Sequence, residues 1–327
     1  MFSSWRALGA ASVAMLVMIA APRTAHTQTD FFNTDGGRPL RVQDAISVEW
    51  RAIELQFAPL KFERHRNNRW QVEVEPELAF GILPRTHLSI GFPLASADRP
   101  ATTLPPNGAL GVASRMYQAH AGGAGAAFRA MPAAPTRVVT GGSGALPGNG
   151  QINGLAGLHL SVFHQLNVET RIPALAVRGE VLLPVGPLGP DRAYPSLTAI
   201  ATRTLPALGA VRVHGNATYT FGAAPNSGVT APIDQPAGAE VPRWFAGVSM
   251  DRAFPLQSTL IAIEAVAHRS MLDNDDVVLS AGAGVRHQFS PRLVLDFGVG
   301  RDLSGPDAQW SFTVGSAIAL SLGRRLF

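Results

Sequence analysis

The sequence predicts an all-β fold: an antiparallel transmembrane β-barrel of the outer-membrane type, with about 12 strands, short periplasmic turns and longer extracellular loops. Three observations support this fold class. Apolar and polar residues alternate along many segments, compact and long connections alternate along the chain, and aromatic residues gather at two levels. A soluble, secreted β-protein would also show the first feature, but it has no reason to alternate its loop lengths.

The alternation is clearest at residues 70–82, WQVEVEPELAFGI. Successive strand residues point to opposite faces, so this segment has one apolar face and one that carries Glu73, Glu75 and Glu77. In a membrane-spanning barrel the apolar face meets lipid and the polar face meets the lumen. The same period predicts about twelve strands: 46–62 (with a bulge near 51–53), 69–82, 87–94, 155–164, 174–183, 195–204, 211–221, 244–252, 258–270, 277–289, 293–301 and 310–322.

The N-terminal residues predict export. Residues 1–27 have the order of a secretory signal peptide: Arg6, then an uncharged apolar run, then small and polar residues. We expect residues 28–44 to form a periplasmic segment and residues 45–327 to form the barrel, with 95–154 as a long extracellular loop rich in Gly, Ala and Pro. The absence of cysteine excludes a disulfide scaffold and a lipoprotein anchor.

The connections support the barrel. Every second one is compact and most of these carry a proline, as at residues 83–86, 204–209, 253–257 and 290–292. The others are polar and mostly longer. Outer-membrane barrels are built in this way, with the short turns on the periplasmic side.

Aromatic residues fall near the ends of the predicted strands. Trp and Tyr concentrate at the ends next to the longer loops, whereas Phe occurs next to the short turns. Two such levels are typical of the two interfaces of a bilayer. The predicted aromatic girdle consists of Trp70, Tyr194, Tyr219, Trp244, Trp310, Phe80 and Phe289.

The charge pattern bears on the partners. The formal net charge is +4, and the basic side chains are arginines except for Lys61. They are scattered through strands and turns, so we expect no nucleic acid partner. The expected partners are outer-membrane lipid and lipopolysaccharide, the barrel-assembly machinery and an unidentified small-molecule solute.

No catalytic motif is evident. Without cysteine, thiol chemistry and zinc–thiolate sites are excluded, and we expect no metal, no cofactor and no enzymatic activity. Some outer-membrane barrels are lipid hydrolases with a His and a Ser two residues apart on the outer face. The pairs His87/Ser89 and His159/Ser161 have this spacing, but the apolar residues beside them form the better lipid face. Both pairs are therefore expected in the lumen.

Charged residues on the predicted inner faces form the candidate site. Three glutamates on one strand repel one another and need cations nearby. Two interpretations remain open: a salt-bridge network that fills a closed lumen, or a charged constriction that selects solutes. The predicted lumen-lining residues are Glu73, Glu75, Glu77, Arg178, Glu180, Arg203, Arg212, His214, Glu264, Arg286 and Asp296.

Three stretches resemble the outer-membrane barrel family named for the MetA pathway of phenol degradation. They begin at residue 70 (WQVEVEPELAFGILPRTHLSIGFPL), residue 157 (GLHLSVFHQLNVETRIPALAVRGEVLLPVG) and residue 286 (RHQFSPRLVLDFGVGRDL). The resemblance implies a transporter-like barrel for small solutes, including hydrophobic or aromatic compounds. We therefore expect a passive channel in the bacterial outer membrane, with a closed structural or adhesive barrel as the alternative.

Overall fold

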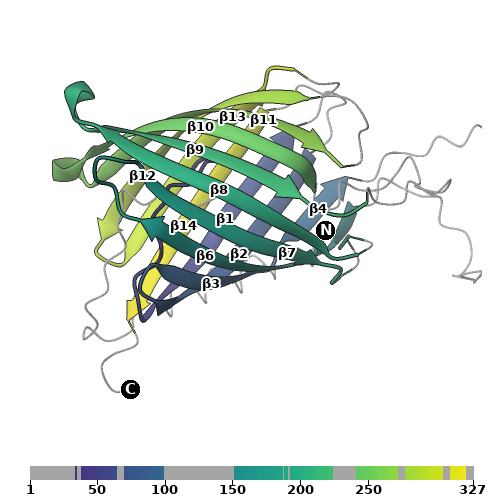
Figure 1. Ribbon diagram of the computed structural model, residues 1–327. Helices are drawn as coiled ribbons and strands as arrows, with labels where there is room; N and C mark the ends of the chain where they lie inside the picture. The colour runs from purple at the N-terminus through teal and green to yellow at the C-terminus, as the bar shows by residue number, and fades with distance from the viewer. Residues whose placement is uncertain are drawn as a thin grey trace, which may run out of the picture.

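The chain forms a closed antiparallel β-barrel (Figure 1). The computed structural model describes residue 34 and residues 38–64, 70–98, 151–186, 188–190, 192–223, 241–271, 277–304 and 310–321. Each strand pairs with its neighbour along the wall, and β1 pairs with both β2 and β14, which closes the barrel. The strands are β1 (Ala52–Arg64), β2 (Trp70–Leu83), β3 (Thr86–Gly91), β4 (Leu94–Asp98), β5 (Gln151–Leu155), β6 (Leu158–Asn167), β7 (Ala174–Leu183), β8 (Tyr194–Leu205), β9 (Val211–Thr220), β10 (Pro242–Phe254), β11 (Thr259–Ser270), β12 (Val278–Ser290), β13 (Leu293–Asp302) and β14 (Trp310–Ser321).

Fourteen segments make twelve strands of wall. β3 and β4 are consecutive parts of one strand, interrupted at residues 92–93, and both pair with β2. β5 and β6 are likewise interrupted at residues 156–157, and they pair with β4 and β3. Proline has no N–H to donate to the ladder, which accounts for the interruption at Pro93. The predicted fold class and strand number are confirmed.

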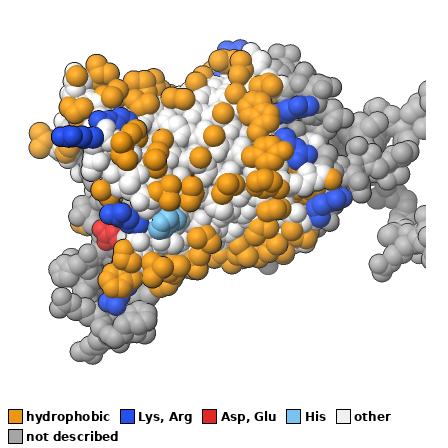
Figure 2. All heavy atoms as spheres, viewed as in Figure 1, with side chains coloured by type: hydrophobic (Ala, Val, Ile, Leu, Met, Phe, Trp, Pro, Cys, Tyr) orange, Lys and Arg blue, Asp and Glu red, His pale blue; other side chains and the backbone are white. Residues whose placement is uncertain are grey.

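The wall has an apolar outer face and a mostly polar inner face. On β6, Leu160 and Val162 are exposed, whereas Ser161 and Phe163 between and beside them are 5% and 2% exposed. Figure 2 shows hydrophobic side chains over the visible outer wall, with Lys and Arg mainly toward its two ends. Lipid thus replaces a protein core as the partner of the apolar face. No helix of the described residues is long and apolar enough to cross a membrane.

Compact connections join the strands at one end of the barrel. Two of them contain 3-10 helices, η1 (Pro206–Leu208) and η2 (Pro255–Gln257), each of which begins at a proline and is followed by a residue in the left-handed region. Proline presets the backbone angle for the turn, and Gly209 adopts the left-handed conformation without steric cost. We call this end the turn side and the opposite end the loop side.

Most predicted strand ends are shifted by a few residues, and the differences at residues 46–52 and 95–154 bear on the lumen and the long loop. The first strand begins at Ala52 rather than residue 46, and Arg51 just before it has a φ of 65°. The predicted bulge at 51–53 is therefore the point where the chain enters the wall, and the bulge of this strand lies between Phe57 and Leu60. At the predicted loop 95–154, β4 and β5 continue their pairing to Asp98 and Gln151, because small and polar residues there still complete the ladder.

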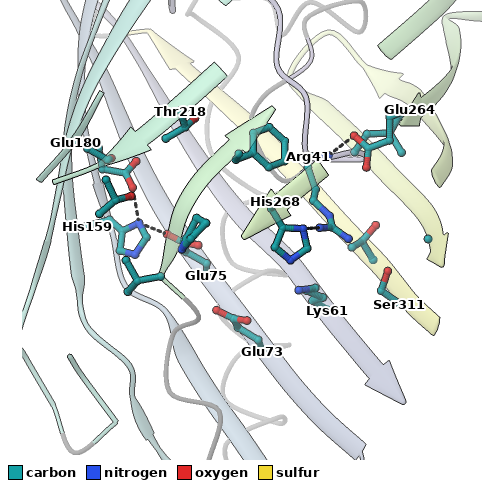
Figure 3. A pocket seen from close by; sticks show the side chains of 18 of the residues that line it. Arg41, Lys61, Glu73, Glu75, His159, Glu180, Thr218, Glu264, His268 and Ser311 are labelled. Atoms are coloured by element: carbon teal, nitrogen blue, oxygen red, sulfur yellow. Dashed lines mark hydrogen bonds and ion pairs between the residues drawn. The ribbon is translucent and has the colours of Figure 1, made fainter. Parts of the chain in front are cut away.

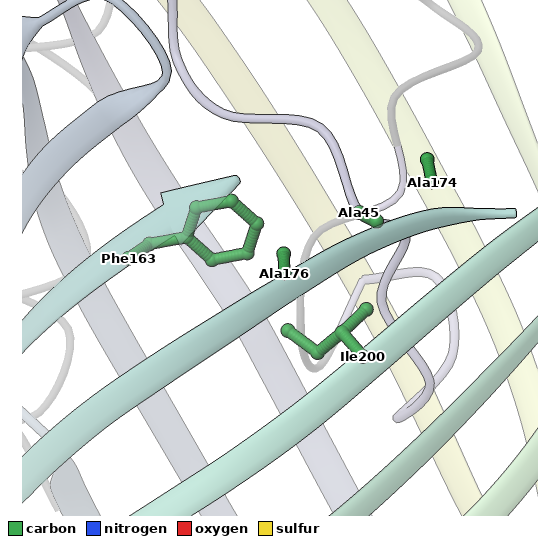
Figure 4. Close-up of a cluster of buried hydrophobic side chains, with 5 residues drawn as sticks. All are labelled: Ala45, Phe163, Ala174, Ala176 and Ile200. Carbon is green, nitrogen blue, oxygen red and sulfur yellow. The ribbon is translucent and has the colours of Figure 1, made fainter. Parts of the chain in front are cut away.

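Residues 38–50, which we call the lumen segment, run inside the barrel. Ala45 is fully buried against Phe163, Ala176 and Ile200, which point inward from β6, β7 and β8 (Figure 4). The expectation that residues 28–44 form a periplasmic segment is thus wrong for Thr34 and residues 38–44. The predicted signal peptide at 1–27 lies outside the described residues.

Candidate functional site

The lumen segment follows the inner wall of the barrel and forms hydrogen bonds to β3, β8, β9, β11, β12 and β14. Irregular backbone at membrane depth is tolerated only where protein satisfies its polar groups, and the wall does so here. The backbone bonds are Val48 N to His87 Nδ1 on β3 (3.2 Å), Ala45 N to Thr202 Oγ1 on β8 (2.9 Å), Gln43 N to Asn216 Oδ1 on β9 (2.9 Å), Arg41 N and Val42 N to Glu264 Oε2 on β11 (2.8 and 3.1 Å), Arg286 Nη2 on β12 to Arg38 O (3.3 Å), and Thr313 Oγ1 on β14 to Pro39 O (3.1 Å).

One buried ionic cluster holds the middle of the lumen segment. Asp251 on β10 accepts bonds from Arg212 Nε and Nη2 at 2.8 and 2.7 Å, and from His214 Nε2 at 2.9 Å. Arg212 also reaches Asp44 of the lumen segment at 3.3 Å. His214 Nδ1 lies 2.9 Å from Thr202 Oγ1. Because Asp251 and Asp44 are each 2% exposed, removing a partner would leave a buried charge unpaired.

A second buried cluster holds the start of the lumen segment. Arg286 on β12 binds Asp296 on β13, and both are almost fully buried. Arg38 adds its guanidinium to the same carboxylate at 3.4 Å and to Glu54 on β1 at 3.4 Å. Two arginines thus share two carboxylates, which balances the charge that the wall and the segment bury together.

Inward glycines make room for the lumen segment. A Cβ added at Gly298 would lie 2.3 Å from Pro39 O, and one at Gly284 would lie 2.7 Å from Pro39 Cβ. At Gly81 an added Cβ would lie 1.9 Å from Glu49 O, where the segment turns into β1. Glycine at these positions is therefore required by close approach of the segment.

A cavity of about 350 Å³ occupies the loop-side half of the lumen (Figure 3). Pro39, Leu40 and Arg41 of the lumen segment line one part of it, and the rest of the lining comes from the wall. A second, smaller space of about 20 Å³ lies beside Gln43, Asp44, Ile46 and Val48, toward the turn side. The segment therefore borders both spaces, a ligand-sized chamber on the loop side and a much smaller one on the turn side.

One side of the cavity is acidic. His159 Nδ1 on β6 lies 3.2 Å from Glu75 Oε1 on β2 and 3.3 Å from Glu180 Oε1 on β7. Glu180 Oε2 also receives Arg178 at 2.8 Å. Figure 3 shows this group facing Arg41 and Glu264 on the other side. The cavity thus brings charges from β2, β6, β7 and β11 into one space.

The structure places ten of the eleven predicted lumen residues inside the barrel. Glu73, Glu75, Glu180 and Glu264 line the cavity, and Glu77 and Arg178 line the smaller space. The other four, Arg212, His214, Arg286 and Asp296, belong to the two buried clusters. The sequence pattern missed their partners in the lumen segment, above all Arg38 and Asp44.

Arg203 is the exception, and its predicted lumen position is wrong. Its neighbour Thr202 points inward to His214, so Arg203 lies on the outer face. There its Nη1 donates to the carbonyl of Thr170 at 2.8 Å, and its Nε lies 3.6 Å from Glu169. It tethers the neighbouring short connection to the wall.

Several residues of the predicted aromatic girdle are exposed on the outer wall. Tyr219, Trp310 and Phe289 are 49%, 45% and 63% exposed on the described wall. Trp244 pairs in register with Tyr219, and Phe80 pairs with Ile53 of β1. The side chain of Trp70 lies outside the described residues.

Tyr194 does not belong to the girdle. It is 1% exposed, lines the cavity and packs with Leu182, Val241 and Met271. The reason is the phase of β8, which starts at Tyr194 and turns its even-numbered residues inward.

The two His/Ser pairs also lie inside the barrel. Ser89 and Ser161 bond to each other at 2.7 Å, and His87 stacks on Phe163 with ring centroids 4.7 Å apart. His159 belongs to the acidic side of the cavity. Neither pair presents a serine and a histidine together to lipid. Among the described residues, no group of three or more acidic, His or Cys side chains is arranged to hold a metal ion.

No family model and no curated protein matches the chain. Three solved structures illustrate its similarity to other barrels. An outer-membrane channel from Pseudomonas putida F1 is 12% identical, with a TM-score of 0.46, and the match covers 85% of this chain and 98% of that one. The KdgM porin is 9% identical, with a TM-score of 0.40 and coverage of 82% and 98%.

The third is outer membrane phospholipase A from Escherichia coli, at 11% identity, a TM-score of 0.36 and coverage of 90% and 98%. These neighbours are outer-membrane β-barrels, as the chain's own strand pattern predicts. Identities and scores this low carry no argument about function, which has to come from the lumen itself.

Proposed function

We propose that the chain is an outer-membrane channel for the passive passage of small solutes, and that the lumen segment closes its pore. One observation carries the proposal: the segment crosses the lumen, bonded to β3, β8 and β9, and a 350 Å³ cavity lies on its loop side. A barrel of about twelve strands lies between those that side chains fill and the wide aqueous porins. A short segment is therefore enough to close it.

The segment is held by contacts that can be broken one at a time. Its bonds to the wall are single hydrogen bonds and ion pairs from side chains rather than a β-ladder. The wall keeps its own pairs when the segment leaves, because Arg212 stays on Asp251 and Arg286 stays on Asp296. Displacement would thus open the lumen without unfolding the barrel.

The solute is small and partly apolar. The cavity lies within the usual size of small-molecule sites, and Leu182, Val241 and Phe245 contribute apolar surface beside the charged groups. Such a lining suits the hydrophobic or aromatic compounds that the family resemblance implies. The loop side is the extracellular entrance in this proposal.

Deletion of residues 34–48 tests the channel. The refolded variant in planar bilayers should show a persistent conductance well above that of the full chain. Heat-modifiable gel migration would establish that the barrel has formed. A folded deletion variant as non-conductive as the full chain would overturn the proposal.

The alternative is a permanently closed structural barrel. The buried clusters around Asp251 and Asp296 favour it, because such networks rigidify a lumen. In that case the deletion should lower the free energy of unfolding while conductance stays at the background level.

A further inference from the structure

We infer that the cavity binds organic cations: small molecules with a protonated amine and an apolar body. The inference rests on the proposed function, because it names the class of solute that enters the same chamber. It follows from the charge of the lining, from the geometry at Glu75 and from the apolar side chains beside the carboxylates.

The lining carries more negative than positive charge. Four carboxylates line the cavity among the described residues, from Glu73, Glu75, Glu180 and Glu264, against the cations of Arg41 and Lys61. Two negative charges remain when both lining histidines are neutral, and one remains when His159 is protonated between Glu75 and Glu180. Arg178 and Asp302 lie next to this lining, bound to Glu180 and Arg41, and their charges cancel. A cation entering this low-dielectric space is attracted, and an anion is repelled.

The acidic side lacks one hydrogen-bond donor. His159 Nδ1 lies between Glu75 and Glu180, and a single N–H cannot satisfy two carboxylates well. Glu180 has Arg178 as a second partner at 2.8 Å. Among the described residues Glu75 has no partner other than His159. An ammonium group has three donors and could bind Glu75 directly.

Apolar side chains occupy other parts of the lining. Leu182 lies on β7 next to Glu180 and packs with Tyr194 of β8 and Val241, and Phe245 lies further round the wall on β10. They provide a surface for the body of the ligand, as small-molecule sites usually do around a few convergent polar groups. An amine linked to a ring by a short chain therefore matches the cavity in charge, donors and apolar surface.

Isothermal titration of the full chain in detergent micelles tests the inference, with protein-free micelles as the reference. The probes are 2-phenylethylammonium, the neutral 2-phenylethanol and the anionic phenylacetate, which share one apolar body. The ammonium should bind about tenfold or more tightly than the alcohol, as expected for a hydrogen bond to a charged group. Phenylacetate should bind more weakly than the alcohol.

Three substitutions locate the site. Glu75→Gln should weaken binding of the ammonium by about tenfold and leave the alcohol unchanged. Glu77→Gln is the matched control, because Glu77 lies on the same strand but lines the smaller space. Glu180→Gln gives a second reading if the first variant does not refold. Equal affinity of the full chain for ammonium and alcohol, or unchanged ammonium binding in folded Glu75→Gln, would overturn the inference.

The conductance of the deletion variant separates this inference from the channel. Selective amine binding by a barrel that does not conduct after deletion of 34–48 would retain the inference and remove the channel. If the deletion variant conducts but the full chain binds ammonium and alcohol equally well, the channel is retained and the inference is removed.

Discussion

Substitution of Asp44 by alanine should release the lumen segment while the wall stays intact. Asp44 Oδ2 accepts bonds from Thr34 N at 3.1 Å and Arg212 Nη1 at 3.3 Å, and Oδ1 accepts one from Ile46 N at 3.2 Å. Arg212 keeps its two bonds to Asp251 in the variant. The substitution therefore weakens docking of the lumen segment and leaves the ion pair of the wall in place.

The size of the effect follows from the bond to Arg212, because the other two bonds lie within the N-terminal stretch itself. A hydrogen bond between charged groups contributes about 2 kcal/mol, so docking should weaken by about 2 kcal/mol. Since 1.4 kcal/mol is a factor of ten, the ratio of released to docked segment should rise roughly 30-fold.

Single-channel recording in planar bilayers measures this ratio as open probability. Glu49→Ala is the matched control, because Glu49 is an exposed carboxylate at the end of the same segment. Its open probability should equal that of the unmodified chain. An Asp44→Ala barrel that is folded, yet opens no more often than the control, would refute the assigned contacts.

Three further predictions concern the wall. Asp251→Ala should lower the free energy of unfolding by about 3–5 kcal/mol, because it leaves the charge of Arg212 buried without its bidentate partner. Urea unfolding in lipid vesicles measures it, and a loss below about 1 kcal/mol would contradict the assignment. Gly298→Ala should raise conductance with little change in circular dichroism, because the new methyl displaces Pro39; unchanged conductance would contradict this. Arg203→Ala should cost no more than about 1 kcal/mol in the same urea assay, as for a surface pair; a loss above about 3 kcal/mol would instead favour a lumen position.

The wall could be predicted because its signals are local. Alternation along residues 70–82 fixes which side chains share a face, and the glutamates of that strand are found on the inner side. The phase of a strand is less certain at its ends. Tyr194 and Arg203 lie near the two ends of β8, and the sequence pattern predicts the wrong face for both.

The lumen segment could not be predicted because its partners are remote. Residues 46–49 alternate like a strand, so they look like a continuation of β1. What places the lumen segment inside the barrel is contact of Val48, Ala45 and Arg41 with residues far along the chain, namely His87, Thr202 and Glu264. One signal was available: Gly284 and Gly298 lie on the inner face, where a narrow barrel needs side chains or another occupant.

A reversible cross-link tests the central claim, that the lumen segment closes the pore, most directly. The chain has no cysteine, so Ala45→Cys with Thr202→Cys introduces a single pair, at the contact where Ala45 N donates to Thr202 Oγ1 at 2.9 Å. In single-channel recordings the oxidised protein should remain closed, and reduction should restore openings. Oxidised and reduced forms with equal conductance would contradict the claim that the segment is the closing element.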